Sequence, residues 1–400
     1  MNKKYFLLLL SYSIFSKAQS NAIVHIPDTA FKDKLLSFTE INSNGDLEIQ
    51  LSEAESFNGE LDINSTGIYD LTGIEAFTNL NFLDCSRNHL TSIDISKNTA
   101  LTTLYCYDNQ LTSLDVSKNS VLDFLKCSDN QLTSLDVSKN TKLTRLYCFN
   151  NKITSLDTSN NTILERLSCS NNQLTRLDIS NCSALIALKC YENQLTSIDI
   201  SDSSALIILK CYANQLTSLD VSNATALKLL NCSGNQLMRL DVSKNTELIR
   251  LNCSANQLSS LNLKNGNNID IETMVAYDNE NLACIQVDDE NYEYLSCFFD
   301  EGWCKDNTAI YSENCATASI VDTEFNDHVS IFPNPVSDIL TVHYSEFGTL
   351  KSVTLYSAIL KTITETNSHT LDFNDLPVGM YFLKIENTEN KITVKKIIKN

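Results

Sequence analysis

The sequence repeats one 21-residue unit nine times, without an insertion, between Leu80 and Asn268. A cysteine recurs at this interval from Cys85 to Cys253, and an asparagine follows each of these cysteines by three residues. One unit, residues 101–121, reads LTTLYCYDNQLTSLDVSKNSV. An unbroken period of this length predicts a stack of similar units, because one unit is too short to bury its apolar side chains alone.

Each unit contains one short alternating segment. In Leu104-Tyr105-Cys106 the outer residues share one face and the tyrosine takes the other, which is the pattern of a strand. Parallel strands about 4.8 Å apart would stack the leucines and cysteines into a continuous core. The asparagine after the strand predicts a ladder of amides that bond backbone groups inside the turn.

The second half of the unit, residues 114–119, echoes the first half. We expect an extended segment there rather than a helix, because 21 residues leave no room for two helical turns. Its asparagine is less strict, since Cys182, Ser203 and Ala224 replace it in three units. The spacing resembles the shortest bacterial leucine-rich repeats. The resemblance implies a mainly β fold, a leucine-rich-repeat solenoid with a concave strand face and capping segments.

The composition and the first residues limit the classes of partner and the cellular location of the protein. A net charge of −19 argues against nucleic acid and anionic membranes as partners. Lys3 and Lys4 precede an apolar run, and Ser16 and Ala18 place small residues before Gln19. Residues 1–18 are therefore interpreted as a signal peptide. The run is too short for a permanent membrane helix, so we expect an exported mature chain without a transmembrane segment.

Residues 19–79 are interpreted as the N-terminal cap, with a helix opening at Pro27-Asp28 and a divergent rung in residues 61–74. Between them lies a segment with the layout of an EF-hand-like calcium loop. Its candidate ligands are Asn42, Asn44, Asp46, Glu48 and Glu53. Leu47 stands where such a loop has glycine, and Asn42 replaces the usual first aspartate, so a polar turn without metal is the alternative.

Residues 269–315 are interpreted as the C-terminal cap. A tenth rung at 271–279 carries Ala276 in the place of the cysteine. Four further cysteines of an exported cap indicate two disulfides with three possible connectivities. We favour the nested pairs Cys284–Cys315 and Cys297–Cys304, which close a small loop around Trp303, the sole tryptophan. Residues 316–328 are interpreted as a linker.

Residues 329–400 form a different domain, without cysteine and with alternating strands, and predict a small antiparallel β-sandwich. Three ordered segments, 331–338, 376–385 and 395–399, closely resemble the C-terminal sorting domain of the type IX secretion system. The resemblance implies export across the outer membrane of a Bacteroidetes-type bacterium, removal of this domain, and release or attachment at the cell surface. The residues that carry it are Pro333, Asn334, Pro335, Gly379, Tyr381, Lys384, Lys395 and Lys396.

The nine repeat cysteines are interpreted as small buried hydrophobes. A metal site needs cysteines that converge on one ion, and an odd number of inward-facing thiols cannot pair along the stack. Cys182, in the second half of its unit, is predicted to be the exposed thiol.

A column of aspartates accompanies the repeats. Carboxylates at the spacing of the rungs repel one another, so solvent, cations or neighbours must compensate them. Lys97, Lys118, Lys139 and Lys244, with serine and threonine hydroxyls, are candidates for this role. A solvated charged face is favoured over calcium along the column. The column comprises Asp94, Asp115, Asp136, Asp157, Asp178, Asp199, Asp220 and Asp241.

The residues beside each cysteine vary and are predicted to face outward on the concave surface, where a solenoid carries specificity. They include Tyr105, Tyr107, Lys126, Tyr147, Phe149, Lys189, Tyr191, Lys210 and Tyr212. Aromatic rings with interspersed lysines suit recognition of an extracellular protein or glycan. The alternative is a structural or adhesive spacer without a specific ligand. The five histidines are scattered and no catalytic motif is found, so we do not expect an enzyme.

Overall fold

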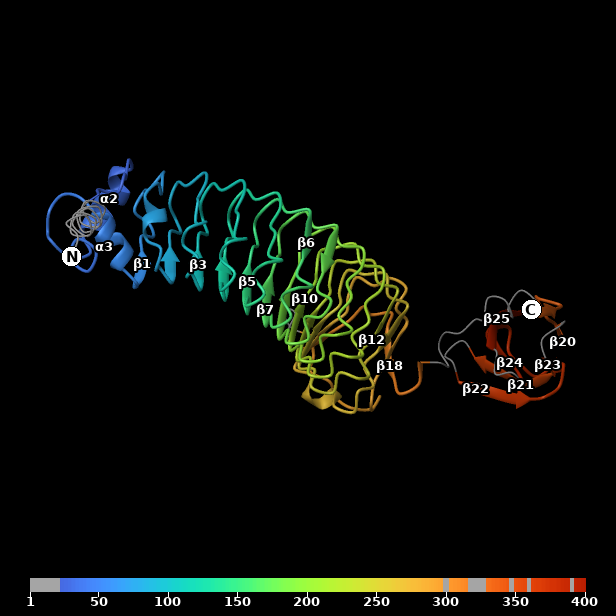
Figure 1. Ribbon diagram of the computed structural model, residues 1–400. Coiled ribbons are helices and arrows are strands. Elements are labelled where there is room, and N and C mark those ends of the chain that lie inside the picture. The colour runs from blue at the N-terminus through green and yellow to red at the C-terminus, as the bar shows by residue number, and fades with distance from the viewer. Residues whose placement is uncertain (1–21, 298–301, 316–328, 345–348, 358–360, 389–391) are drawn as a thin grey trace, which may run out of the picture. The chain divides into compact units, whose positions relative to one another are not determined.

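The computed structural model divides the chain into two compact units, Met1–Glu313 and Asn314–Asn400 (Figure 1). It describes residues 22–297, 302–315, 329–344, 349–357, 361–388 and 392–400. The predicted signal peptide and the predicted linker at 316–328 lie outside these residues.

The first unit is a solenoid built on one parallel sheet of twelve short strands. Every strand contributes three residues and lies beside the strand of the next turn, so that Leu104 pairs with Leu83 on one side and Leu125 on the other. This confirms a mainly β solenoid. In sheet order the strands are β1 (Glu60–Asp62), β2 (Phe82–Asp84), β3 (Thr103–Tyr105), β4 (Phe124–Lys126), β5 (Arg145–Tyr147), β7 (Arg166–Ser168), β9 (Ala187–Lys189), β10 (Ile208–Lys210), β11 (Leu229–Asn231), β13 (Arg250–Asn252), β15 (Thr273–Val275) and β17 (Gly302–Cys304).

The core of the solenoid is a column of leucines and cysteines. Leu104 and Cys106 are fully buried while Tyr105 between them is half-buried, as the alternation of a strand requires. The nine repeat cysteines are all buried and free. Cys182 is buried as well, so the prediction of an exposed thiol was wrong. Its sulfur lies 3.4 Å from the carbonyl oxygen of Thr158, inside the second half of the stack.

The asparagine after each strand joins neighbouring rungs. The amide nitrogen of Asn130 lies 2.9 Å from the Cys106 carbonyl of the preceding rung and within 3.3 Å of two carbonyls of its own turn. Its oxygen accepts a hydrogen bond from the Leu111 N–H, at 2.9 Å. One side chain thus satisfies backbone groups of two rungs that the turn would otherwise leave unpaired.

The second asparagine of the unit is bonded on one side only. The amide nitrogen of Asn119 donates to the carbonyls of Ile95 and Asn98, at 3.1 and 2.8 Å. Its buried oxygen has no hydrogen-bond partner among the described residues. Because only the donor is used, a smaller side chain loses less at this position, which explains why Cys182, Ser203 and Ala224 occur there.

The convex half of the solenoid consists of short extended segments and two short 3-10 helices. Some of the extended segments pair as strands and none of the described ones is an α-helix, as the length of the unit predicts. The strands are β6 (Ser155–Asp157), β8 (Arg176–Asp178), β12 (Arg239–Asp241), β14 (Ser260–Asn262), β16 (Cys284–Gln286) and β18 (Ile310–Ser312). The 3-10 helices η1 (Ile74–Ala76) and η2 (Asn268–Asp270) complete this part of the chain.

The aspartate column lies on this half, and its charges are compensated locally. Asp115 accepts a 2.8 Å hydrogen bond from the backbone N–H of Ser117, and every aspartate of the column is bonded in this way by the serine two residues on. Hydrogen bonds from the side chain and backbone of Ser117 hold the pKa of Asp115 below its usual range, ahead of the charge of Lys118. The serines therefore contribute more than the lysines proposed from the sequence.

The N-terminal cap contains α2 (Thr29–Leu36) and α3 (Leu51–Ser56). Asp28 caps α2, since one carboxylate oxygen accepts from the Phe31 N–H at 3.0 Å. The other oxygen accepts from the N–H groups of Tyr69 and Asp70, at 2.8 and 3.1 Å. The cap is thereby tied to the first rung, and the buried Phe31 covers the end of the core.

The C-terminal cap closes the other end of the sheet. In β17, Trp303 takes the place of the rung leucine beside Met274 and donates its indole N–H to the Ile271 carbonyl at 2.9 Å. This strand was not predicted from the sequence. Gly302 is required there because its φ is +79° and an added Cβ would lie 2.5 Å from the Ser296 carbonyl oxygen.

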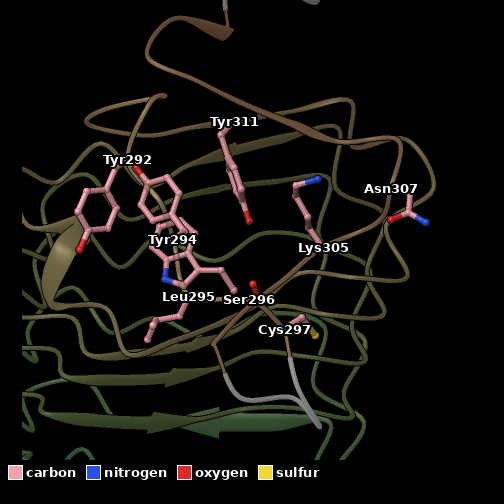
Figure 2. Close-up of a pocket in the computed structure, with 9 residues that line it drawn as sticks. Tyr292, Tyr294, Leu295, Ser296, Cys297, Lys305, Asn307 and Tyr311 are labelled. Carbon is pink, nitrogen blue, oxygen red and sulfur yellow. The ribbon is translucent and has the colours of Figure 1, made fainter.

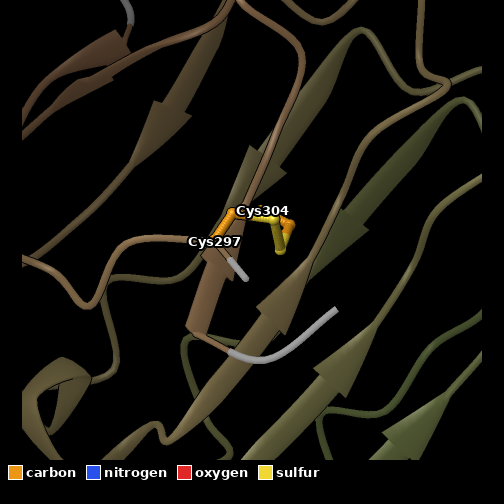
Figure 3. Close-up of a disulfide and its surroundings, with 2 residues drawn as sticks. All are labelled: Cys297 and Cys304. Carbon is orange, nitrogen blue, oxygen red and sulfur yellow. A yellow bond between two sulfur atoms is a disulfide. The ribbon is translucent and has the colours of Figure 1, made fainter. Parts of the chain in front are cut away.

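Disulfides hold this cap. The predicted bond between Cys297 and Cys304 is present at a Cα–Cα distance of 4.7 Å (Figure 3). Cys284 and Cys315 are disulfide-bonded as well, whereas the ten cysteines of the repeats are free.

The second unit is a small antiparallel sandwich, as predicted. Its two sheets have the strand orders β19-β20-β23 and β22-β21-β24-β25. Leu340 and Val342 of one sheet and Leu355 and Leu383 of the other belong to one buried cluster. The strands are β19 (Val329–Phe332), β20 (Ile339–Tyr344), β21 (Leu350–Ser357), β22 (Thr362–Thr366), β23 (Thr370–Asp372), β24 (Gly379–Asn387) and β25 (Ile392–Lys399).

Candidate binding face

The outward side chains of the twelve-stranded sheet form the candidate binding face. The strands lie on the inner side of the curve that the rungs follow (Figure 1). On each strand the central residue is buried, so the first and third residues point outward, as Thr103 and Tyr105 do on β3. The residue after the cysteine, such as Tyr107, is half-buried beside them.

Aromatic rings cover the first rungs of this face in a zigzag. Tyr105 packs edge-on between Phe82 and Phe124, with ring centroids 5.5 and 5.0 Å apart, and Phe124 packs in the same way on Tyr147 at 5.2 Å. The rings alternate between the first and third strand positions of successive rungs. We call these four residues the aromatic zigzag. Edge-to-face packing holds the half-buried rings in place before any partner arrives.

Cations lie against Phe124 of the zigzag and against the neighbouring Tyr107. The Lys126 ammonium is 3.6 Å from the centroid of the Tyr107 ring, and the Arg145 guanidinium carbon is 5.4 Å from that of Phe124. Arg87 approaches Tyr107 from the other side at 5.5 Å. These contacts orient positive side chains over the aromatic surface.

A second group of predicted residues lies further along the solenoid. Tyr191 and Tyr212 stack nearly parallel, with centroids 4.4 Å apart, and Lys189 and Lys210 are register partners on β9 and β10. Burial, together with the neighbouring Tyr191, raises the pKa of Tyr212 to about 12, so its hydroxyl stays protonated at neutral pH. The structure thus separates the predicted residues into two groups. Phe149 has no aromatic ring contact among the described residues.

Four further residues of this face also point outward and were not predicted from the sequence, namely Phe82, Phe124, Arg145 and Arg166. They occupy the first strand position, two residues before the outward position that was considered. The alternation of side chains along a strand was sufficient to find these residues, because both neighbours of the buried leucine must face outward.

The predicted calcium ligands lie in one loop of the N-terminal cap. Both oxygens of Glu53 are engaged, one by the backbone N–H groups of Ser43 and Asn44 and one by that of Gln50, at 2.9 to 3.3 Å. Glu48 forms an ion pair with Lys32 at 2.6 Å. Calcium binding at this loop stays a prediction, and it requires Glu53 to exchange these donors for the ion. In the described part of the chain no group of three or more His, Cys, Asp or Glu side chains is placed to hold a metal ion.

An aromatic pocket of about 330 Å³ lies in the C-terminal cap (Figure 2). Trp303 stacks on Tyr294 with centroids 4.0 Å apart and meets Tyr311 edge-on at 5.6 Å. Figure 2 shows the Tyr292 and Tyr294 rings on one side of the pocket and Lys305 and Asn307 on the other. Lys305 donates to the Ala309 carbonyl at 2.5 Å, which gives this ammonium a structural partner.

The structure brings the predicted sorting residues of the second unit together. Asn334 donates to the Lys396 carbonyl and accepts from the Ile398 N–H, both at 2.8 Å, so the loop of Pro333 to Pro335 is bonded to the last strand. Tyr381 is buried against Phe373. Lys384 and Lys395 lie on the paired strands β24 and β25, as does Gly379. In the described residues no helix is long and apolar enough to cross a membrane.

Comparison with protein families identifies two parts of the chain. The family described as secretion system C-terminal sorting domain matches residues 330–400. The family described as leucine-rich repeats (2 copies) matches residues 78–119. No curated protein sequence matches the chain.

Comparison with solved structures finds one that shares the fold of the solenoid, and others of lower similarity. The functional domain of InlJ from Listeria monocytogenes, which includes a cysteine ladder, is 22% identical with a TM-score of 0.57 and covers 93% of this chain and 99% of its own. Internalin InlF of the same organism is 20% identical, with a TM-score of 0.42 and coverages of 68% and 98%. A leucine-rich-repeat protein of Leptospira interrogans is 20% identical, with a TM-score of 0.43 and coverages of 63% and 79%.

The leucine-rich-repeat match lies within the solenoid, and the sorting-domain match lies within the second unit. The sorting domain indicates a protein that the type IX secretion system delivers to the cell surface or the medium. The chain therefore carries leucine-rich repeats in a solenoid with the fold of the InlJ domain, followed by a C-terminal secretion sorting domain.

Proposed function

We propose that the protein is an extracellular recognition protein that binds a protein or glycan partner on its concave strand face. The observation that carries this proposal is the aromatic zigzag together with the cations that lie against Phe124 and the neighbouring Tyr107. A solenoid that served only as a spacer has no need of half-buried rings at positions where other rungs carry serine or asparagine, as Ser168 and Asn231 do. Tyrosine and arginine are the side chains that dominate binding energy at protein interfaces.

The rigidity of the scaffold supports this role. Neighbouring rungs are bonded to one another through the strand backbones and through asparagine side chains such as Asn130, so the face is ordered before it meets a partner. Binding to such a surface costs little conformational entropy. Secretion through the sorting domain implies that the partner is extracellular, and we propose that residues 329–400 are removed during export.

Replacing Tyr105, Tyr107, Tyr147, Phe149, Tyr191 and Tyr212 with serine should weaken partner binding more than about tenfold, because these rings supply most of the apolar contact area. The assay is capture of extracellular proteins and glycans by the immobilised full chain, followed by titration of the captured ligand. A matched control replaces six exposed glutamines of the repeats with serine. They are Gln110, Gln131, Gln173, Gln194, Gln215 and Gln236.

The control should bind as the wild type does, because the glutamines lie outside the strands. If the serine variant of the aromatic residues retains full affinity for a specific ligand, the concave face is not the binding site. If neither the wild type nor the variants retain any ligand, the alternative of a structural or adhesive spacer is favoured instead.

A further inference from the structure

We infer that the concave face binds an acidic polypeptide segment along a band of five cations; this rests on the proposed function and specifies the partner's chemistry. The band runs over five strands that are consecutive in the sheet, namely β4, β5, β7, β9 and β10. Each strand carries one cation at an outward position, in the order Lys126, Arg145, Arg166, Lys189 and Lys210. We call these residues the cation band.

The cations of the band repel one another. Arg145 is the direct register partner of Arg166, and Lys189 is that of Lys210, across parallel strands about 4.8 Å apart. Like charges placed side by side on one sheet face destabilise the fold. Because this electrostatic repulsion recurs along the band and does not favour folding, we attribute the cations to binding.

Among the described residues, none of the five cations forms an ion pair with a carboxylate. No outward position of these five strands is acidic. The nearest carboxylates in sequence are Asp123, Asp129, Glu165 and Glu192. Asp123 accepts instead from the Thr144 hydroxyl and Asp129 from the Asn150 amide, each at 2.6 Å.

The charge of the band is opposite to that of the chain. The whole protein carries a net charge of −19, and the convex half presents the aspartate column. A positive band on the inner face of such a chain attracts an anionic partner to this face and repels cationic ones. Arg145, Arg166 and Lys189 are exposed, so their charged ends can reach a bound partner.

The residues around the band favour a polypeptide over a polysaccharide. Phe124 and Tyr147 flank its first rungs, and the half-buried Ile208 and Leu229 flank its last. Aliphatic and aromatic side chains next to charged ones are typical of protein–protein interfaces. In such interfaces apolar side chains of the partner pack between the charged contacts. Four steps between rungs span roughly 19 Å, which about thirteen residues of an α-helix would cover.

The test measures binding of poly-L-glutamate to the full chain at low and high salt. One variant carries Arg145→Ser, Arg166→Ser, Lys189→Ser and Lys210→Ser. The matched control carries serine at Lys97, Lys118, Lys139 and Lys244, which lie on the convex half and remove the same charge. The band variant should lose about tenfold or more in affinity at low salt and most of the salt dependence, while the control binds as the wild type does.

Each other outcome contradicts the inference. Equal losses in both variants would mean that net charge, rather than the band, governs binding. Binding of polygalacturonate without binding of poly-L-glutamate would assign the band to an anionic polysaccharide. If the aromatic variant loses a captured partner while the band variant keeps it, recognition by the concave face stands and the acidic partner is wrong. Neither variant should melt below the wild type, and the band variant should melt above it because the repulsion is relieved, which separates lost binding from lost folding.

Discussion

Replacing Asn130 with alanine should lower the free energy of unfolding by roughly 3 kcal/mol or more. The substitution leaves the Leu111 N–H and the Cys106, Cys127 and Ser128 carbonyls without their side-chain partner, in a position where Asn130 is only 9% exposed. Buried backbone groups that lose a partner retain their full desolvation cost. Denaturation by guanidinium, followed by circular dichroism, measures the loss.

Two control substitutions allow the loss of stability in Asn130→Ala to be compared with smaller expected losses. Asn119→Ala removes only donated bonds, because its oxygen has no partner among the described residues, and should cost less than Asn130→Ala. Gln131→Ala changes an exposed side chain and should stay within about 0.5 kcal/mol of the wild type. Equal costs at Asn119 and Asn130 would contradict the one-sided bonding of the second asparagine.

The repeat thiols should be almost inert in the folded protein. Burial raises the pKa of Cys148, Cys211 and Cys253 to about 12, from an ordinary value of 9.0. Near neutral pH this lowers the thiolate fraction by about a thousandfold, and the fully buried sulfur atoms are also closed to a reagent. Alkylation by iodoacetamide, counted by mass spectrometry, should therefore be slower by at least about this factor in buffer than in denaturant.

Cys182 provides the internal check. If one thiol per folded chain reacts quickly and the reaction disappears in Cys182→Ser, the outer position is accessible and its burial is wrong. Slow reaction at all ten free cysteines agrees with the structure.

The same pKa values give a stability that depends on pH. The folded-state pKa of these thiols lies above the unfolded value, so stability is fully present below about pH 9 and falls as the pH rises toward about 12. Only the unfolded chain releases these protons within that window. Denaturation midpoints at about pH 8 and about pH 10.5 should therefore differ, with the lower midpoint at the higher pH.

The sequence by itself was sufficient for the regular part of the fold. A period that never slips places Leu104, Cys106 and Asn109 at equivalent positions in every rung, and their alternation leaves one choice of inward face. The helix after Asp28 follows from its capping residue, and the terminal sandwich follows from alternating strands.

Only the tertiary structure decided the features that depend on contacts between rungs. Cys182 is buried because the second half of each unit also stacks inward, which a column containing asparagine, serine, alanine and cysteine does not reveal. The aromatic zigzag depends on diagonal contacts between different strand positions, which the order of residues within one unit does not contain. Trp303 completes the sheet without any repeat pattern to mark it, because a cap needs only one side chain large enough to cover the last rung.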